Sequence, residues 1–181
     1  MTGTAVAEEH EQEEEETVTE DEETEEISLT VNGEDQTFDV DPETPLLYVL
    51  RNEAELNGPR FGCGLSQCGA CEVLVDDSPV ISCTTPISDV EGDEVTTARG
   101  LGTSDDPHPI QEAFIEEEAA QCGFCSHGLL METKVLLDEN PDPSDDEIRE
   151  ALDDNLCRCG THTEIVNAVH RAADNMDQAN D

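Results

Sequence analysis

Eight cysteines are the residues in this 181-residue chain whose type and spacing could do chemistry. The first four form C-x4-C-x2-C followed by a later thiol: Cys63, Cys68, Cys71 and Cys83. Plant-type [2Fe-2S] ferredoxins have this spacing, and their four thiolates hold two irons. Gly62, Gly64 and Gly69 would let the loop fold tightly and turn backbone N–H groups toward the sulfurs. The spacing favours a cluster over zinc, because zinc sites usually pair two C-x2-C knuckles and this set has one.

The second set combines a C-x2-C at one expected helix junction with a C-x-C at another: Cys122, Cys125, Cys157 and Cys159. Cys157 and Cys159 are too close in sequence for an easy disulfide with each other. Two helix junctions could present four thiolates either to zinc or to an iron-sulfur cluster. The spacing of this set therefore predicts a metal site and leaves both kinds of metal open.

Composition limits the partners and the compartment. The chain has 47 acidic against 7 basic residues, so a formal charge of −40 would repel nucleic acids and anionic membrane surfaces. It contains neither an apolar run of the roughly 18 residues that span a bilayer nor a signal-peptide pattern at its start. We therefore expect a cytoplasmic protein without membrane insertion. In such a reducing compartment the cysteines are metal ligands rather than a disulfide framework.

The acidity extends over the whole chain. Residues 1–26 form an acidic tail that we expect to be disordered, and the remaining sequence is also rich in Asp and Glu. Lysine occurs once, at Lys134. Self-repulsion of this size opposes folding unless salt screens it, and at molar salt the Debye length is about 3 Å. We infer a halophilic cytoplasm.

The elements that must position the first cysteine set are those of a small α+β domain at 27–100. Apolar residues alternate over 27–40 around Asn32-Gly33, which predicts a β-hairpin. Thr44 is a candidate N-cap for a short helix that starts at Pro45. Further strands are expected at 71–76, at 80–83 and near 93–98.

The second set belongs to a helical domain. Residues 101–109 are rich in turn formers and predict a linker, 110–175 predicts four helices, and 176–181 is a tail. The apolar residues Ile110, Phe114 and Ile115 line the first helix, and later helices carry similar stripes. Ser144 with Glu147 predicts a capping box at the start of the third helix. Four short helices suggest a bundle.

With both sets in place, the chain resembles the small iron-sulfur subunit of the xanthine dehydrogenase family of molybdenum hydroxylases. The resemblance rests on "CGLSQCGAC" with Cys83, "HPIQEAF", "QCGFC", "NPDPSDDEIREAL" and "NLCRCG", in family order over roughly Ile27 to Val169. It implies a plant-type ferredoxin-like β-grasp domain followed by an all-α four-helix-bundle domain, each with one [2Fe-2S] cluster.

The resemblance also assigns roles. Cys122, Cys125, Cys157 and Cys159 become the proximal set, nearest the molybdopterin of a large catalytic partner, and Cys63, Cys68, Cys71 and Cys83 become the distal set. Gln121 matches a residue whose side chain approaches that pterin. The protein would relay single electrons from the molybdenum centre to a cytochrome, an FAD-binding subunit or another acceptor. The "GLSQC" and "CRCGT" stretches resemble subunits whose partners oxidise aldehydes or N-heterocycles.

Two positions depart from the family pattern. Two functions other than that of a molybdenum hydroxylase subunit also stay open. His127 stands where many relatives have Pro, and "GTH" with His162 replaces a frequent Thr-Gly-Tyr. The residues would also fit a free-standing ferredoxin-like carrier or a zinc-stabilised interaction protein. We expect His108, His162 and His170 to be surface or packing residues, because thiolates already complete both sites.

Overall fold

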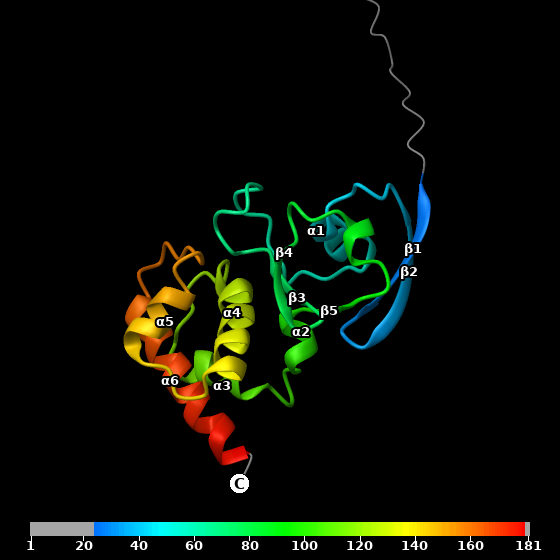
Figure 1. Ribbon diagram of the computed structural model, residues 1–181. Helices are drawn as coiled ribbons and strands as arrows, with labels where there is room; N and C mark the ends of the chain where they lie inside the picture. Colours follow the sequence, from blue (N-terminus) through cyan, green and yellow to red (C-terminus); the bar gives the residue numbers. More distant parts are fainter. Residues whose placement is uncertain (1–23, 180–181) are drawn as a thin grey trace, which may run out of the picture.

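The computed structural model describes residues 24–179, so the predicted acidic tail lies almost wholly outside the described residues. A five-stranded sheet with short helices forms one side of the molecule, and helices α3 to α6 form the other (Figure 1). The elements of the sheet side are β1 (Glu25–Val31), β2 (Glu34–Val40), α1 (Leu46–Tyr48), the π-helical turn η1 (Val49–Glu53), β3 (Glu72–Val75), β4 (Ser78–Ile81), the 3₁₀ turn η2 (Ile87–Val90), β5 (Glu94–Thr96) and α2 (Ala98–Leu101).

The sheet is mixed, with the strand order β2-β1-β5-β3-β4. The hairpin prediction is confirmed: β1 and β2 are antiparallel, with Val31 opposite Glu34. Asn32 and Gly33 turn between them with φ values of 52° and 81°, as a two-residue hairpin turn requires. Strand β1 begins at Glu25, earlier than expected, because Glu25 and Glu26 still pair with the end of β2. β5 joins β1 in parallel and β3 in antiparallel, so it ties the two hairpins together.

The short helix after the hairpin is present, but its predicted cap is wrong. Pro45, not Thr44, is the N-cap residue of α1, and it makes no side-chain capping bond. Thr44 instead uses its main-chain carbonyl to accept a hydrogen bond from Ile87 N–H at 2.9 Å. Helix α1 then continues directly into η1, and the wider turn buries Val49 and Leu50 against the sheet.

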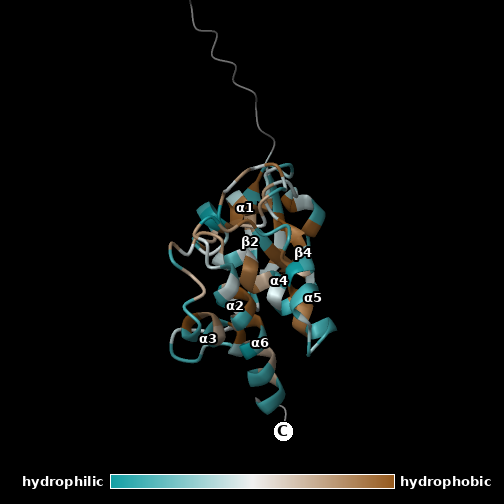
Figure 2. Cartoon of the chain, turned by 90° about the vertical axis from the view of Figure 1, so that its left-hand side faces the viewer, coloured by the Kyte–Doolittle hydropathy of each residue, from teal (hydrophilic) through white to brown (hydrophobic). Residues whose placement is uncertain are grey.

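Two apolar cores support the two sides of the molecule. The first lies between one face of the sheet and the α1–η1 segment, and Leu46, Leu50, Val73, Ile87 and Val95 are its fully buried members. The second is enclosed by the helices on the other side, with Ile110, Ile148, Ala168 and Val169 fully buried. Figure 2 shows that the last turns of α6 are mostly hydrophilic. A mixed sheet on one side and helices on the other confirm the α+β class expected from the sequence.

The helical side consists of α3 (Pro109–Glu116), α4 (Ser126–Glu139), α5 (Asp145–Ala151) and α6 (His162–Ala179). Helix α3 starts within the segment expected as a linker, because proline suits the first helical position. His108 caps α3: its Nδ1 accepts from Ile110 N–H, while its own N–H donates to Gln111 Oε1. The prediction that Ile115 shares the buried stripe is wrong, since its side chain is 71% exposed. It follows Phe114 by about 100° around the helix and so leaves the buried face.

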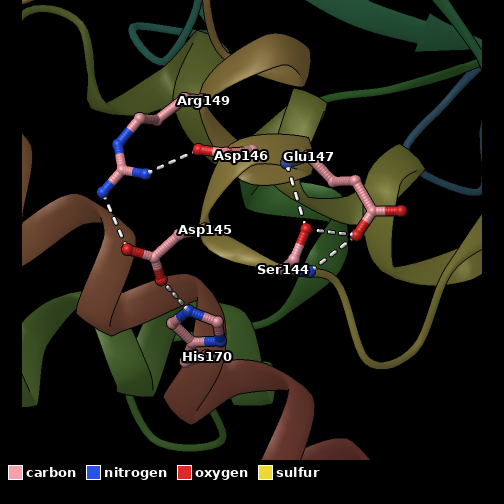
Figure 3. Close-up of polar contacts among 6 residues, drawn as sticks. All are labelled: Ser144, Asp145, Asp146, Glu147, Arg149 and His170. Carbon is pink, nitrogen blue, oxygen red and sulfur yellow. Dashed lines mark hydrogen bonds and ion pairs between the residues drawn. The ribbon is translucent and has the colours of Figure 1, made fainter.

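Polar contacts fasten the start of α5 (Figure 3). The predicted capping box is confirmed, with Ser144 Oγ accepting from Glu147 N–H and Ser144 N–H donating to Glu147 Oε2. Asp145 pairs with Arg149 at 2.7 Å on its own helix and with His170 of α6 at 2.8 Å. The hydrogen bond from His170 is the main cause that lowers the pKa of Asp145. These contacts hold α5 against α6.

Helix α4 packs against β3 and β4 and also contacts α3 and α5, so it joins the helical side to the sheet. Its first turn lies closest to the sheet side, where Gly128 faces Gly69. In the part of the chain that the structure describes, none of the helices has the length and apolar character needed to cross a bilayer.

Candidate metal centres

The first cysteine set occupies the loop between η1 and β3, together with the turn that follows β4. The loop turns in part through Gly69, whose φ is +67°. Leu65 N–H and Gln67 N–H both donate to Cys63 Sγ at 3.3 Å. These two bonds, Gln67 first, lower the pKa of the Cys63 thiol to about 7. The loop is thus arranged to stabilise a thiolate at Cys63, as a metal ligand requires.

The four thiols of this set lie close enough to interact. Cys63 interacts with Cys68, and Cys71 interacts with both Cys83 and Cys68. Cys71 and Cys83 are buried with Leu47 in a small apolar cluster under the loop. Burial is the main cause that raises the pKa of Cys71 to about 12. A metal-free thiol at this position stays protonated, and a bound metal would have to displace its proton.

The second cysteine set lies where two helix starts meet. Cys122 and Cys125 lie just ahead of α4, and Cys157 and Cys159 lie just ahead of α6. Cys159 Sγ is 3.4 Å from Cys122 Sγ, and Cys125 interacts with Cys157. The structure therefore brings together residues more than thirty positions apart, which sequence spacing alone could not do.

The cysteines of the second set differ in burial and in the direction of their pKa shifts. The Phe124 N–H is the main cause that lowers the pKa of Cys122, which is exposed. Burial is the main cause that raises the pKa of Cys125 to about 12. Burial also acts to raise the pKa of Cys157, but the Thr161 hydroxyl and nearby N–H groups outweigh it and the pKa is lowered. Cys157 Sγ and Thr161 Oγ1 are 3.6 Å apart.

The donor sets fit a two-iron cluster. Each set brings four thiols together, and a [2Fe-2S] cluster takes four thiolates shared between two irons. All eight cysteines are free thiols. Among residues 24–179, no three His, Cys, Asp or Glu side chains are arranged to hold a single metal ion.

Gln121 lies next to Cys122, at the edge of a cavity of about 860 Å³. Phe114, Ile115 and Leu130 line it on the apolar side, and Thr161 and Glu164 line it near the start of α6. Phe124, two residues after Cys122, is also exposed. Gln121 is exposed and can donate or accept hydrogen bonds toward a partner at this surface.

The histidine in the first turn of α4 is buried. His127 lies in the first turn of α4 and is 4% exposed. A Cβ on Gly58 would come within 2.8 Å of its Nδ1, so the ring fills the space beside the loop at 58. Burial lowers its pKa to about 4 despite the nearby Glu72 carbonyl, which favours the protonated ring. His127 therefore packs as a neutral side chain between α4 and the sheet side.

Sequence reasoning missed two buried polar residues that join the segments of the two sets: Glu72 and Asn155. Burial is the main cause that raises the pKa of Glu72 to about 8, and the nearby Glu132 carboxylate adds to it. A carboxylate that directly follows a cysteine ligand in a strand was the available signal for Glu72. Nothing in the local sequence marks Asn155 as buried.

One thiol set lies beside the mixed sheet, and the other lies in the helical half. This combination points to the class of two-cluster [2Fe-2S] proteins. Residues 29–101 match the family described as 2Fe-2S iron-sulfur cluster binding domain, and residues 97–170 match the family described as [2Fe-2S] binding domain.

Relatives narrow this class to one family. The chain is 53% identical to a nicotinate dehydrogenase subunit of Pseudomonas putida, over 82% of this chain and 94% of that relative. It is 36% identical to the nicotinate dehydrogenase small FeS subunit of Eubacterium barkeri, also over 82% of this chain and 94% of that relative. The chain therefore belongs to the family of small iron-sulfur subunits of molybdenum hydroxylases.

Solved structures agree with this family. Quinoline 2-oxidoreductase from Pseudomonas putida 86 matches with a TM-score of 0.82 and 36% identity, over 86% of this chain and 98% of that chain. The aldehyde oxidoreductase from Desulfovibrio desulfuricans matches with a TM-score of 0.82 and 41% identity, over 85% of this chain but only 17% of the other. The sheet side thus has a ferredoxin-like [2Fe-2S] fold.

Proposed function

We propose that this chain is the electron-transfer subunit of a molybdenum hydroxylase complex, in which a large partner subunit holds molybdopterin. Cys63, Cys68, Cys71 and Cys83 of the β-grasp domain would hold the distal cluster. Cys122, Cys125, Cys157 and Cys159 of the four-helix bundle would hold the proximal cluster. When bound, the two clusters supply one-electron carriers between the molybdenum centre and a cytochrome, an FAD-binding subunit or another acceptor.

One observation carries the proposal: the two thiol sets lie in loops that contact each other. Leu156 N–H donates to the carbonyl of Cys68 at 3.1 Å, and Leu156 directly precedes Cys157. A Cβ on Gly62 would lie 3.6 Å from the ring of Phe124, which stands between Cys122 and Cys125. Sites held in direct contact within one chain suit a relay.

The protein's own residues prepare the ligands for this role. Leu65 N–H and Gln67 N–H stabilise the Cys63 thiolate, and the Phe124 N–H does the same for Cys122. Cys71 and Cys125 are buried and keep water from one side of each site. Hydrogen bonds and burial of this kind set the reduction potential of an iron-sulfur cluster.

The surface around Cys122 supports a large partner at the proximal site. Gln121 and the exposed side chain of Ile115 border the 860 Å³ cavity, and Phe124, which follows Cys122 by two residues, is exposed as well. We assign to Gln121 a hydrogen bond to the pterin of the partner. The substrate would be an N-heterocycle or an aldehyde, since the names of the relatives refer to nicotinate, quinoline and aldehydes.

The net charge of −40 supports a cytoplasm at high salt as the setting of the complex. Affinity purification of the tagged chain in molar potassium chloride tests the partner. Recovery of a large molybdopterin-binding chain is expected, whereas a chain recovered alone with intact clusters would favour a free-standing electron carrier. A colourless protein with zinc and without labile sulfide would instead identify a zinc-stabilised interaction protein and contradict the redox function.

A further inference from the structure

A buried polar contact lies between the two thiol sets. Asn155 is 7% exposed and Glu72 is 4% exposed. Asn155 Nδ2 donates to Glu72 Oε2 at 3.4 Å, across 83 residues of sequence. Asn155 comes two residues before Cys157, and Glu72 directly follows Cys71. One side chain thus connects the segment that carries a proximal thiol to the strand that carries a distal one.

The amide of Asn155 is wedged between two glycines. A Cβ on Gly69 would lie 2.4 Å from Asn155 Oδ1, and a Cβ on Gly128 would lie 2.6 Å from the same atom. Real Cβ atoms do not approach other heavy atoms below 3.0 Å, so neither position has room for a larger residue in this packing. Asn155 therefore fills the space where the distal loop, the first turn of α4 and the 152–157 segment meet.

The segment that contains Asn155 also makes a main-chain hydrogen bond to the distal loop. Asn155 N–H donates to the Leu152 carbonyl at 3.0 Å, and the next N–H, that of Leu156, donates to the Cys68 carbonyl at 3.1 Å. From Cys68 to Cys157, the connection thus consists of covalent bonds and one hydrogen bond. This bond is a main-chain link between the two thiol sets, and its donor comes directly after Asn155 in the chain.

Stability alone does not account for the choice of asparagine. Within residues 24–179, Asn155 Oδ1 is buried without a hydrogen-bond partner, and so is Glu72 Oε1. Buried unsatisfied oxygens of this kind cost stability, and replacing Asn155 and Glu72 together by apolar side chains of similar size would avoid that cost. A residue that is kept at such a cost needs a function.

We propose that Asn155 is a positioning residue for electron transfer between the two clusters, and this inference rests on the function proposed above. It fixes the separation of the two ligand loops and the Leu156–Cys68 hydrogen bond between them. With both clusters bound, one electron would pass from the reduced proximal cluster to the oxidised distal cluster, and no bond would form or break. The electron comes from the molybdenum centre of the partner, or from a chemical reductant when the chain is studied alone.

The test compares Asn155→Ala with wild type, both as the full chain with its clusters, and uses Asn52→Ala as the matched control. Asn52 is exposed in η1, so its variant removes the same amide away from both sites. Photochemical one-electron reduction followed by freeze-quench electron paramagnetic resonance measures how fast the electron equilibrates between the clusters. We expect equilibration to slow about tenfold in Asn155→Ala, the lower end of the effect that loss of an outer-sphere partner has on metal affinity or activity. Asn52→Ala should match wild type.

A second readout separates positioning from general stability. Hydrogen–deuterium exchange should rise at the segment around Leu156 in Asn155→Ala, while each cluster keeps its own spectrum and potential. An unchanged equilibration rate in Asn155→Ala, with wild type transferring normally, overturns the inference and leaves the proposed function intact. A wild-type chain with fewer than two cluster signals, or with no electron passing between them, refutes the proposed function itself.

If Asn155→Ala loses a cluster, Asn155→Asp is measured instead. It keeps the shape of the side chain but replaces the Nδ2 donor by an acceptor that faces Glu72. Slower equilibration in Asn155→Asp supports positioning, and a wild-type rate overturns it. Loss of a cluster in both variants would show that Asn155 serves cluster assembly, which also overturns the inference.

Discussion

The contact between α4 and the distal loop makes a quantitative prediction for Gly128→Ala. A Cβ on Gly128 would lie 2.0 Å from the carbonyl oxygen of Gly69. The main chains of α4 and the loop would have to separate by about 1 Å or more to reach the 3.0 Å that real Cβ atoms respect. Forced overpacking costs about 1–3 kcal/mol. Alanine returns up to about 1 kcal/mol through its helix propensity.

We therefore expect Gly128→Ala to lower the free energy of unfolding by about 2 kcal/mol, the upper overpacking cost of about 3 kcal/mol less about 1 kcal/mol from helix propensity. In a chain of this size, 2 kcal/mol corresponds to a melting temperature about 4–8 °C lower. Thermal unfolding followed by circular dichroism at high salt measures it. Hydrogen–deuterium exchange should also rise in the loop around Gly69.

Gly92→Ala is the control for this variant. Gly92 has a φ of +85°, and no atom of the described residues lies within 4 Å of its would-be Cβ, so alanine there costs only backbone strain of about 1–2 kcal/mol. It should leave exchange around Gly69 unchanged. A Gly128→Ala protein that unfolds at or above the wild-type temperature, with an unchanged loop, would refute the close packing of α4 on the loop.

Three further predictions concern the ligands, the helices and the salt dependence. Cys122→Ser should remove the signal of one [2Fe-2S] cluster and leave the other, as seen by electron paramagnetic resonance; loss of both would contradict separate sites. Asp145→Asn should lower the melting temperature near neutral pH. The pKa of Asp145 is lowered in the folded chain, so its stabilisation is present above the ordinary value of 3.8 and is lost as pH falls through the folded pKa. The two proteins should therefore converge at strongly acidic pH, and a difference that persists there would contradict the ion-pair explanation. Finally, native circular dichroism should require molar salt and disappear on dialysis to low salt, and a chain that loses it only at high salt would contradict the halophilic setting.

Much of the fold could be predicted because local rules determine it. Asn32-Gly33 between alternating strands specifies a hairpin turn, and Ser144 with Glu147 specifies a helix start. Thr44 was the wrong cap, because its main chain is used by η2 instead of by α1. The π-helical turn after α1 has no local sequence signal, since the packing of Leu50 in the core selects it.

For the candidate sites, too, the sequence predicts some features and not others. Cysteine spacing predicted the two thiol sets, and the set at 63–83 carries a recognised ferredoxin spacing. The pairing of Cys122 with Cys159 depends on how two helix starts meet in space, so spacing could not show it. Likewise, the contact of Asn155 with Gly69 joins segments that only the folded chain brings together. Local patterns therefore predicted which cysteines belong to each set. Tertiary packing decides which of these cysteines lie next to each other.

The most direct test of the central claim is electron paramagnetic resonance of the full chain after stepwise chemical reduction, with iron and labile sulfide measured on the same sample. Two bound clusters predict two distinct [2Fe-2S] signals, with iron and labile sulfide in equal amounts. A single signal, or a colourless chain that contains zinc and no labile sulfide, would contradict the account.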